Sequence, residues 1–173
     1  IDNALVVTMD GDRRVLEGAS VAISGTRIAA IGPRDEIARA HPADTVIDGS
    51  RKALMPGFVD VHAHAGHGLI KTLGLAGDGD WERACHTAYT VASDTGFWAA
   101  EAALSAVERI RCGTTTGVAY LGGGDDVMRT DEPIYAEAHC REIERLGTRS
   151  VVAVGINRPP FPKTYANIEG GSY

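Results

Sequence analysis

The sequence lacks the long apolar runs and the paired cysteines that mark membrane-spanning and disulfide-stabilised proteins. Its longest uninterrupted apolar stretches, such as 151–154, fall far short of the roughly 20 residues that cross a bilayer. The three cysteines are odd in number and form no C-x-x-C pair, so a disulfide framework is not expected. We therefore expect a reducing, cytoplasmic location and no membrane partner.

Basic charge is scarce as well. The 173 residues include 17 Lys and Arg against 23 Asp and Glu, a formal net charge of -6, and no basic cluster stands out. Nucleic acid is therefore not an expected partner. Glycine, in contrast, is abundant at 21 residues, which indicates many tight turns between short elements. The hydrophobic share of 44% is that of an ordinary globular protein.

Residues 1–55 are predicted to form the N-terminal part of a small β-sandwich domain. Turn pairs such as Asp10-Gly11 and Ser24-Gly25 separate short segments with strand-like composition. Pro33 at a first helical position predicts a short surface helix that ends near Ala40. The predicted strands are Ala4–Thr8, Arg13–Leu16, Ser20–Ser24, Arg27–Ile31, Thr45–Asp48 and Lys52–Met55.

From residue 56 to 173 strands and helices alternate, which predicts an α/β fold with a parallel sheet built from about three βα units. The predicted strands are Phe58–His64, Thr114–Leu121 and Arg149–Asn157, and the predicted helices are Asp80–Ala92, Thr95–Cys112 and Glu132–Leu146. On the second helix, residues at helical spacing predict the face that packs on the sheet. They are Ala100, Ala103, Leu104, Val107 and Ile110.

The first of these strands carries the residues that indicate chemistry. Side chains alternate along a strand, so Asp60, His62 and His64 are expected to share one face. Burying two unpaired imidazoles and a carboxylate costs several kcal/mol, roughly, and a bound metal ion removes that cost. Two histidines at i and i+2 are close enough to converge on one ion. Taken alone, however, an H-x-H pair favours the alternative of two hydrogen-bonded core histidines.

A family resemblance decides between these alternatives. The stretch 53–64, which ends in Pro56-Gly57-Phe58-Val59-Asp60-Val61-His62-Ala63-His64, resembles the amidohydrolase superfamily. The segments Leu69-Ile70-Lys71 and Ile110-Arg111-Cys112-Gly113-Thr114-Thr115-Thr116 resemble its cytosine deaminase and chlorohydrolase branch. The resemblance implies the first three βα units of a (β/α)₈ TIM-type barrel, preceded by part of the β-sandwich.

The resemblance also implies the activity and the metal. His62 and His64 match the family's metal ligands, and a metal-activated water would attack an sp² carbon of an amide, a carbamate, or an amino- or halo-substituted heterocycle. One divalent ion is expected. Zinc is the first choice, and iron, cobalt, nickel and manganese remain alternatives because ligand type alone does not select among them.

Four further residues lie at or just past the carboxyl ends of the predicted strands, where barrel enzymes build their active sites. They are His67, Tyr120, Asn157 and Arg158, which we expect to bind the small-molecule substrate, with an ordinary loop or strand-end role as the alternative. Asp60 could orient a metal ligand or be a buried structural carboxylate. His139 is expected to be a packed structural histidine.

The chain is too short for a complete barrel, which typically needs about 250 residues. The family completes its site with two further His and an Asp from later strands. We therefore expect a partner polypeptide that supplies the remaining strands and ligands, in an oligomer of separate or cleaved chains. The Ile1 start and the Gly/Ser-rich end fit cleavage. The alternative function is a catalytically inactive barrel fragment that serves as a folding or assembly partner.

Overall fold

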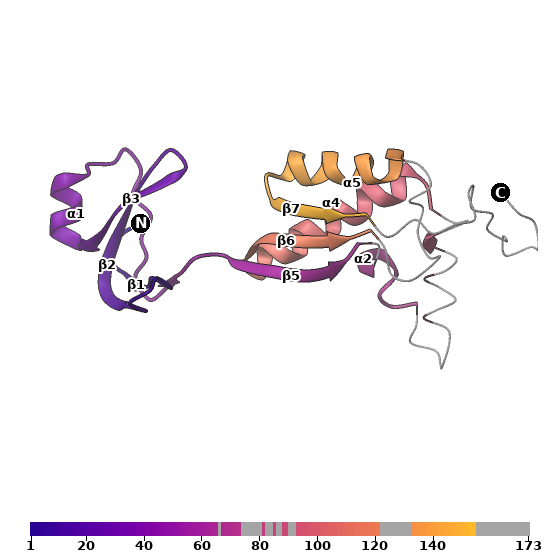
Figure 1. The fold of residues 1–173 in the computed structure, drawn as a ribbon. Helices are drawn as coiled ribbons and strands as arrows, with labels where there is room; N and C mark the ends of the chain where they lie inside the picture. The colour runs from indigo at the N-terminus through magenta and orange to yellow at the C-terminus, as the bar shows by residue number, and fades with distance from the viewer. Residues whose placement is uncertain are drawn as a thin grey trace, which may run out of the picture. The chain divides into compact units, whose positions relative to one another are not determined.

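A computed structural model of the chain describes residues 1–65, 67–73, 81, 85, 88, 89, 93–121 and 133–154. The chain divides into two compact units, Ile1–Pro56 and Gly57–Tyr173 (Figure 1). Among the described residues, no helix is both long enough and apolar enough to span a membrane. The predicted helix Asp80–Ala92 lies mostly outside the described residues.

The first unit is a four-stranded sheet with a short helix, α1 (Arg34–Ala40). The strands, in the order β3-β2-β1-β4, are β3 (Arg27–Pro33), β2 (Val15–Ser24), β1 (Ala4–Val7) and β4 (Ala53–Leu54). β1 and β3 both pair with β2 antiparallel, whereas β4 pairs with β1 in parallel. The side chains of Ala4, Val6, Ala19 and Val21 form its core.

Two strand predictions in this unit are wrong. The segments Arg13–Leu16 and Ser20–Ser24 are not two separate strands, because one continuous strand, β2, runs from Val15 to Ser24 and Gly18 at φ +60° forms a bulge in it instead of a turn. Thr45–Asp48 is not a strand and contributes a single bridge, between Asp2 and Asp48. The Asp48 side chain accepts a hydrogen bond from the Ser50 amide at 2.9 Å, which stabilises a local turn instead.

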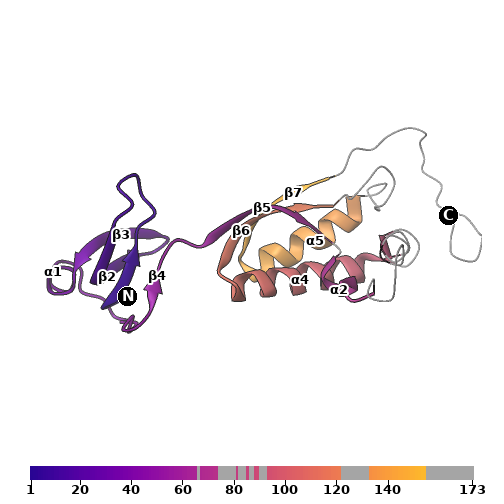
Figure 2. The same ribbon diagram turned by 90° about the horizontal axis from the view of Figure 1, so that it is seen from below.

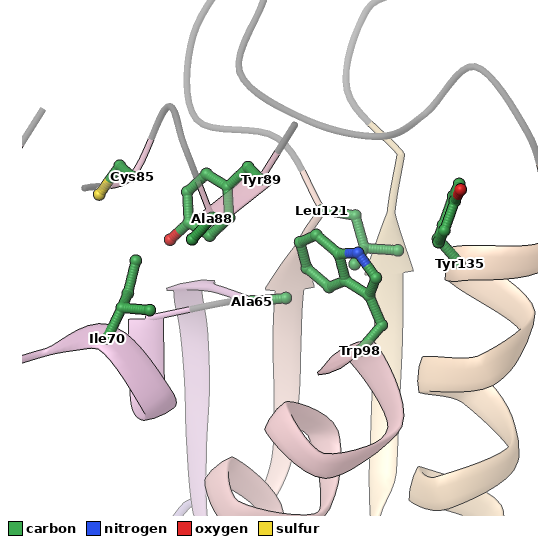
Figure 3. Packing of buried hydrophobic residues seen from close by; sticks show 8 residues of the cluster. All are labelled: Ala65, Ile70, Cys85, Ala88, Tyr89, Trp98, Leu121 and Tyr135. Atoms are coloured by element: carbon green, nitrogen blue, oxygen red, sulfur yellow. The ribbon is translucent and has the colours of Figure 1, made fainter. Parts of the chain in front are cut away.

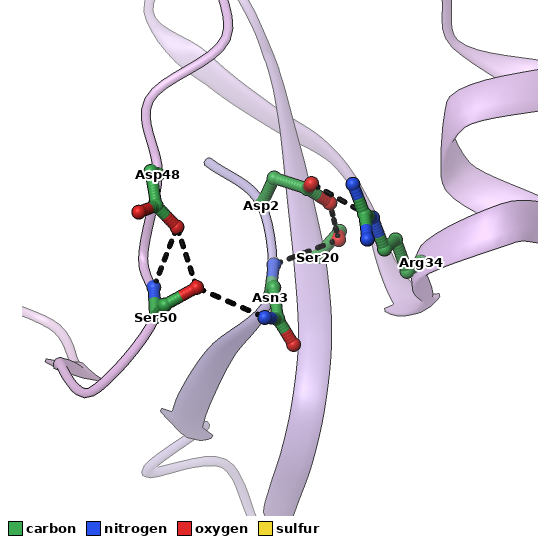
Figure 4. A network of polar contacts seen from close by, with 6 residues as sticks. All are labelled: Asp2, Asn3, Ser20, Arg34, Asp48 and Ser50. Atoms are coloured by element: carbon green, nitrogen blue, oxygen red, sulfur yellow. Dashed lines mark hydrogen bonds and ion pairs between the residues drawn. The ribbon is translucent and has the colours of Figure 1, made fainter.

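A polar network joins the start of the chain to three other parts of the first unit (Figure 4). Asp2 forms an ion pair with Arg34 at the start of α1, at 2.9 Å, and accepts a hydrogen bond from the Ser20 hydroxyl at 2.6 Å. Asn3 donates its side-chain amide to Ser50 at 3.0 Å. These contacts tie the first residues to β2, to α1 and to the turn before β4.

The second unit is a parallel sheet with helices on one face (Figures 1 and 2). Its strands, in spatial order, are β5 (Phe58–His64), β6 (Thr114–Tyr120) and β7 (Arg149–Ala153). A short helix, α2 (His67–Ile70), follows β5, and the covering helices are α4 (Thr95–Arg111) and α5 (Pro133–Leu146). β5 has its predicted bounds, and β6 ends one residue earlier than predicted. Glycines at positive φ, Gly113 and Gly147, follow α4 and α5.

The core of this unit lies at the carboxyl ends of β5 and β6 (Figure 3). The buried side chains there are Ala65, Ile70, Cys85, Ala88, Tyr89, Trp98, Leu121 and Tyr135. A second cluster, between α4 and α5, consists of Ala102, Ala106 and Ile143. Apolar burial therefore concentrates at the strand ends that carry His64 and Tyr120.

The predicted buried face of α4 is wrong. Val107 and Ile110 are exposed, whereas the buried residues of this helix are Trp98, Glu101, Ala102 and Ala106. The small side chains of Ala102 and Ala106 allow α5 to approach α4 closely. The face of α4 that packs is therefore the one with these alanines, and not the predicted face with Val107 and Ile110. Glu101 occupies the buried face because its carboxylate finds hydrogen-bond donors there.

His139 on α5 is a buried histidine, 2% exposed, and neither of its ring nitrogens has a hydrogen-bond partner within the described part of the chain. Burial lowers the pKa of His139 below its usual value; Glu101 opposes this shift and Arg109 adds to it. At mildly acidic pH the His139 ring therefore binds a proton in the unfolded chain that it does not bind in the folded chain. Stability contributed by the neutral ring is present above about pH 6.5 and is lost as the pH falls below it.

Replacing His139 by Leu should therefore stabilise the chain and reduce its sensitivity to acid. We expect the free energy of unfolding at pH 7.5 to rise by about 1 kcal/mol, because leucine has no ring nitrogens that are buried without a hydrogen-bond partner. Urea unfolding at pH 7.5 and 5.5 measures both effects. An identical loss of stability between these two pH values in His139→Leu and in the unmodified chain would contradict this assignment, and His41→Leu is the control.

Candidate functional site

The site begins with an irregularity in β5. Asp60 pairs with Gly117 of β6 and Ala63 pairs with Ala119, so three steps along β5 match two along β6. Such a bulge reverses the alternation of side chains. The prediction that Asp60 shares a face with the two histidines is therefore wrong. Its carboxylate instead lies 3.8 Å from the guanidinium of Arg109 on α4, on the face that the helices cover.

His62 lies within the bulge and His64 follows it, and the two side chains do share a face. Their Nε2 atoms lie 3.2 Å apart, and the ring planes are inclined by 74°. Two nitrogens bound to one zinc ion at about 2.0–2.1 Å with tetrahedral geometry lie roughly 3.3 Å apart, so the observed separation fits two ligands of one ion. Without an ion, one ring can donate a hydrogen bond to the other, depending on the tautomer.

Tyr120 lies beside this pair at the end of β6. Its backbone pairs with that of His64, and its ring centroid is 5.5 Å from that of His62 and 6.0 Å from that of His64. Because paired residues of a parallel sheet project to the same side, the tyrosine and the two histidines occupy the sheet face opposite the helices. The phenol is therefore within reach of a molecule bound at the histidine pair.

His67 approaches the pair from α2. Its ring stacks on that of His64, with centroids 5.1 Å apart and planes inclined by 28°. Trp81 and Tyr89 pack against the same ring, at 5.2 and 5.9 Å. Burial, and after it the charge of His64, lowers the pKa of His67, while Glu101 opposes the shift. This histidine is therefore held in a half-buried aromatic environment next to the candidate metal ligand.

The structure thus brings together His62, His64, His67 and Tyr120, while Asn157 and Arg158 lie outside the described residues. No group of three His, Cys, Asp or Glu side chains among the described residues could hold a metal ion. The candidate ligands in this part of the chain are therefore limited to the pair His62 and His64. Sequence reasoning missed Glu101, whose only signal was its position on the same helical stripe as Trp98 and Ser105.

The comparisons with known proteins point to one superfamily. Residues 21–43 match a family model described as an imidazolonepropionase-like composite domain of bacteria. The 5-methylthioadenosine/S-adenosylhomocysteine deaminase of Nitratidesulfovibrio vulgaris is 33% identical over 169 residues, which cover 96% of this chain and 35% of that protein.

Two solved structures show a similar fold. A zinc-containing atrazine chlorohydrolase from Arthrobacter aurescens has a TM-score of 0.64 at 20% identity, over 88% of this chain and 34% of that one. The Escherichia coli guanine deaminase has a TM-score of 0.62 at 19% identity, over 91% of this chain and 35% of that one.

The chain belongs to the amidohydrolase superfamily. It spans about a third of the length of the relatives it matches. Among those relatives are deaminases and a chlorohydrolase.

Proposed function

We propose that this chain is the N-terminal third of a metal-dependent hydrolase that cleaves a non-peptide carbon–nitrogen bond in an amino-substituted heterocycle. The observation that carries the proposal is the 3.2 Å separation of the Nε2 atoms of His62 and His64 at the end of one strand. Membership of the amidohydrolase superfamily supports it. The same residues would serve an amide, a carbamate or a halogenated ring.

His62 and His64 would hold one divalent ion, with zinc as the first choice. When bound, such an ion lowers the pKa of a water ligand toward neutrality and so supplies a nucleophile at physiological pH. Tyr120 would line the substrate pocket with its phenol, and His67 would contact the substrate from α2. Asn157 and Arg158 are proposed to extend that pocket on the same grounds of strand-end position.

The names of the relatives support the substrate class. One deaminates 5-methylthioadenosine and S-adenosylhomocysteine, another deaminates guanine, and a third is a hydrolase of a triazine. Each of these compounds has a nitrogen heterocycle with a leaving group on an sp² carbon. We therefore propose an amino-substituted purine or a related ring as the substrate.

Activity would require polypeptide beyond this chain, whether as a continuation or as a partner. β5 and β7 are the two edges of the described sheet, and each pairs only with β6. The sheet face that bears the histidines also exposes Val59 and Val151. Open edges and an exposed apolar face fit the start of a (β/α)₈ barrel whose remaining strands complete the metal site. The alternative is an inactive fragment that has kept only the role of an assembly partner.

The proposal is tested by elemental analysis of the native assembly, together with release of ammonia from amino-substituted purines. We expect about one divalent ion per copy of this chain, as a single catalytic site requires, and ammonia release that stops on chelation and returns with zinc. An assembly that is free of metal and inactive under zinc-replete conditions would contradict the enzyme and favour the alternative.

A further inference from the structure

Glu101 is a buried carboxylate in the middle of α4. It is 0% exposed and lies with Trp98 and Tyr89 among the largest fully buried side chains. Removing a carboxylate from water costs several kcal/mol, roughly, unless hydrogen bonds replace its hydration. A buried Glu on a helix face that otherwise packs Ala102 and Ala106 is therefore a feature that requires a partner.

Its partners come from the segment that follows the histidine strand. The Gly68 amide donates to Oε1 at 3.1 Å and the Leu69 amide donates to Oε2 at 2.8 Å. The Ser105 hydroxyl, one turn further along α4, also donates to Oε1. Hydrogen bonds to a charged acceptor are stronger than neutral ones, so these three donors offset much of the desolvation cost.

Glycine at position 68 permits this contact. A Cβ atom there would lie 2.9 and 3.0 Å from the two carboxylate oxygens and 3.0 Å from the Ser105 hydroxyl. Real Cβ atoms essentially never approach within 3.0 Å, so any other residue would force either the Glu101 carboxylate or the backbone at position 68 to shift. Either shift weakens the hydrogen bonds from Gly68 and Leu69, and His67, whose ring stacks on His64, immediately precedes this glycine.

We propose that Glu101 is a positioning residue of the candidate active site. By binding the backbone of Gly68 and Leu69, it holds the His67 ring against His64, Trp81 and Tyr89. The link between this position and substrate binding rests on the proposed function, in which His67 contacts the substrate. Within the described residues the hydrogen bonds of Glu101 go to the backbone of α2 and to Ser105, so its positioning effect on His67 passes through that backbone.

The first test measures the His67 ring in the chain itself by NMR. In the unmodified chain its ring protons should be shifted upfield by the neighbouring aromatic rings, relative to those of His41. In Glu101→Gln the carboxylate loses one acceptor oxygen, and most of this upfield shift should be lost. Glu108→Gln is the matched control, because Glu108 lies on the same helix and pairs with Lys71, next to the same segment, at the surface. It should leave the His67 shift unchanged.

Gly68→Ala weakens the same hydrogen bonds by an independent route and should also abolish the upfield shift. Folded Glu101→Gln and Gly68→Ala chains with an unchanged His67 shift would overturn the proposal. Should both variants unfold, the unmodified chain decides the matter by hydrogen exchange. The Gly68 and Leu69 amides should be protected, and their exchange at unfolded-chain rates would overturn the proposal equally.

The second test separates positioning from general structural support in the complete enzyme. We expect His67→Ala and Glu101→Gln each to raise KM roughly tenfold, the scale of one lost hydrogen bond. The KM of the double variant should be no higher than that of His67→Ala alone, because both changes remove the same contact between His67 and the substrate. Additive effects would overturn the positioning role. Unchanged kinetics in His67→Ala would instead contradict the substrate contact, while leaving the NMR result on Glu101 intact.

Discussion

His62→Ala is expected to abolish specific metal binding and, in the completed enzyme, turnover. The variant removes one of two nitrogens that lie 3.2 Å apart and leaves a single imidazole at the site. Residues that merely support a ligand already contribute about 10–100-fold to metal affinity, so the loss of a ligand should exceed that range. Zinc titration followed by calorimetry, together with elemental analysis, measures the effect.

His41→Ala is the control for this experiment, because His41 is the residue that ends α1 in the other unit. It should bind zinc like the unmodified chain. Full metal content and a full turnover rate in His62→Ala would contradict the proposed metal site. The parallel result for His64→Ala should match, as both rings are required to bind one ion.

Val151→Asp is expected to prevent completion of the enzyme without unfolding the chain. Val151 is 63% exposed on β7, and it pairs with Val118 on the sheet face that bears His64. An exposed substitution changes the free energy of unfolding by about 0.5 kcal/mol or less. Covering an unpaired carboxylate costs several kcal/mol, and a cost of about 3 kcal/mol would already weaken association by roughly 100-fold.

Activity and elution by size exclusion measure this effect in an assembly of separate chains, and activity alone does so in a continuous chain. Val15→Asp is the matched control, because Val15 is 59% exposed but lies in the first unit. It should retain activity. A Val151→Asp protein with full activity would show that nothing covers this face during catalysis, and the proposed barrel would then be wrong.

Local signals in the sequence were sufficient for the bounds of β5, since the Pro56-Gly57 turn precedes it and its last residue is His64, as predicted. They also sufficed for α5, which Gly147 ends in a left-handed conformation. The pair His62 and His64 was accessible for the same reason, because two residues on one strand need no knowledge of tertiary structure to be placed together.

The features that the sequence did not predict depend on contacts between residues far apart in the chain. The orientation of Asp60 depends on how β5 pairs with β6, more than fifty residues later in the chain. A glutamate between apolar residues of a helix normally indicates a solvated position, and the donors that bury Glu101 lie 32 and 33 residues away. The exposure of Val107 follows from the face on which α4 packs, which the composition of the helix does not reveal.

The register of β5 and β6 shows how two local insertions can cancel. Phe58 pairs with Thr114 and Val59 with Thr116, so β6 first carries one additional residue, Thr115. Between Asp60 and Ala63, β5 then carries one of its own, and both strands span seven residues. Each strand thus contains one extra residue, and the two extra residues compensate, so that the strands are back in register at His64 and Tyr120. Deleting one residue at either bulge would shift His64 away from Tyr120, whereas deleting one at each would restore the alignment.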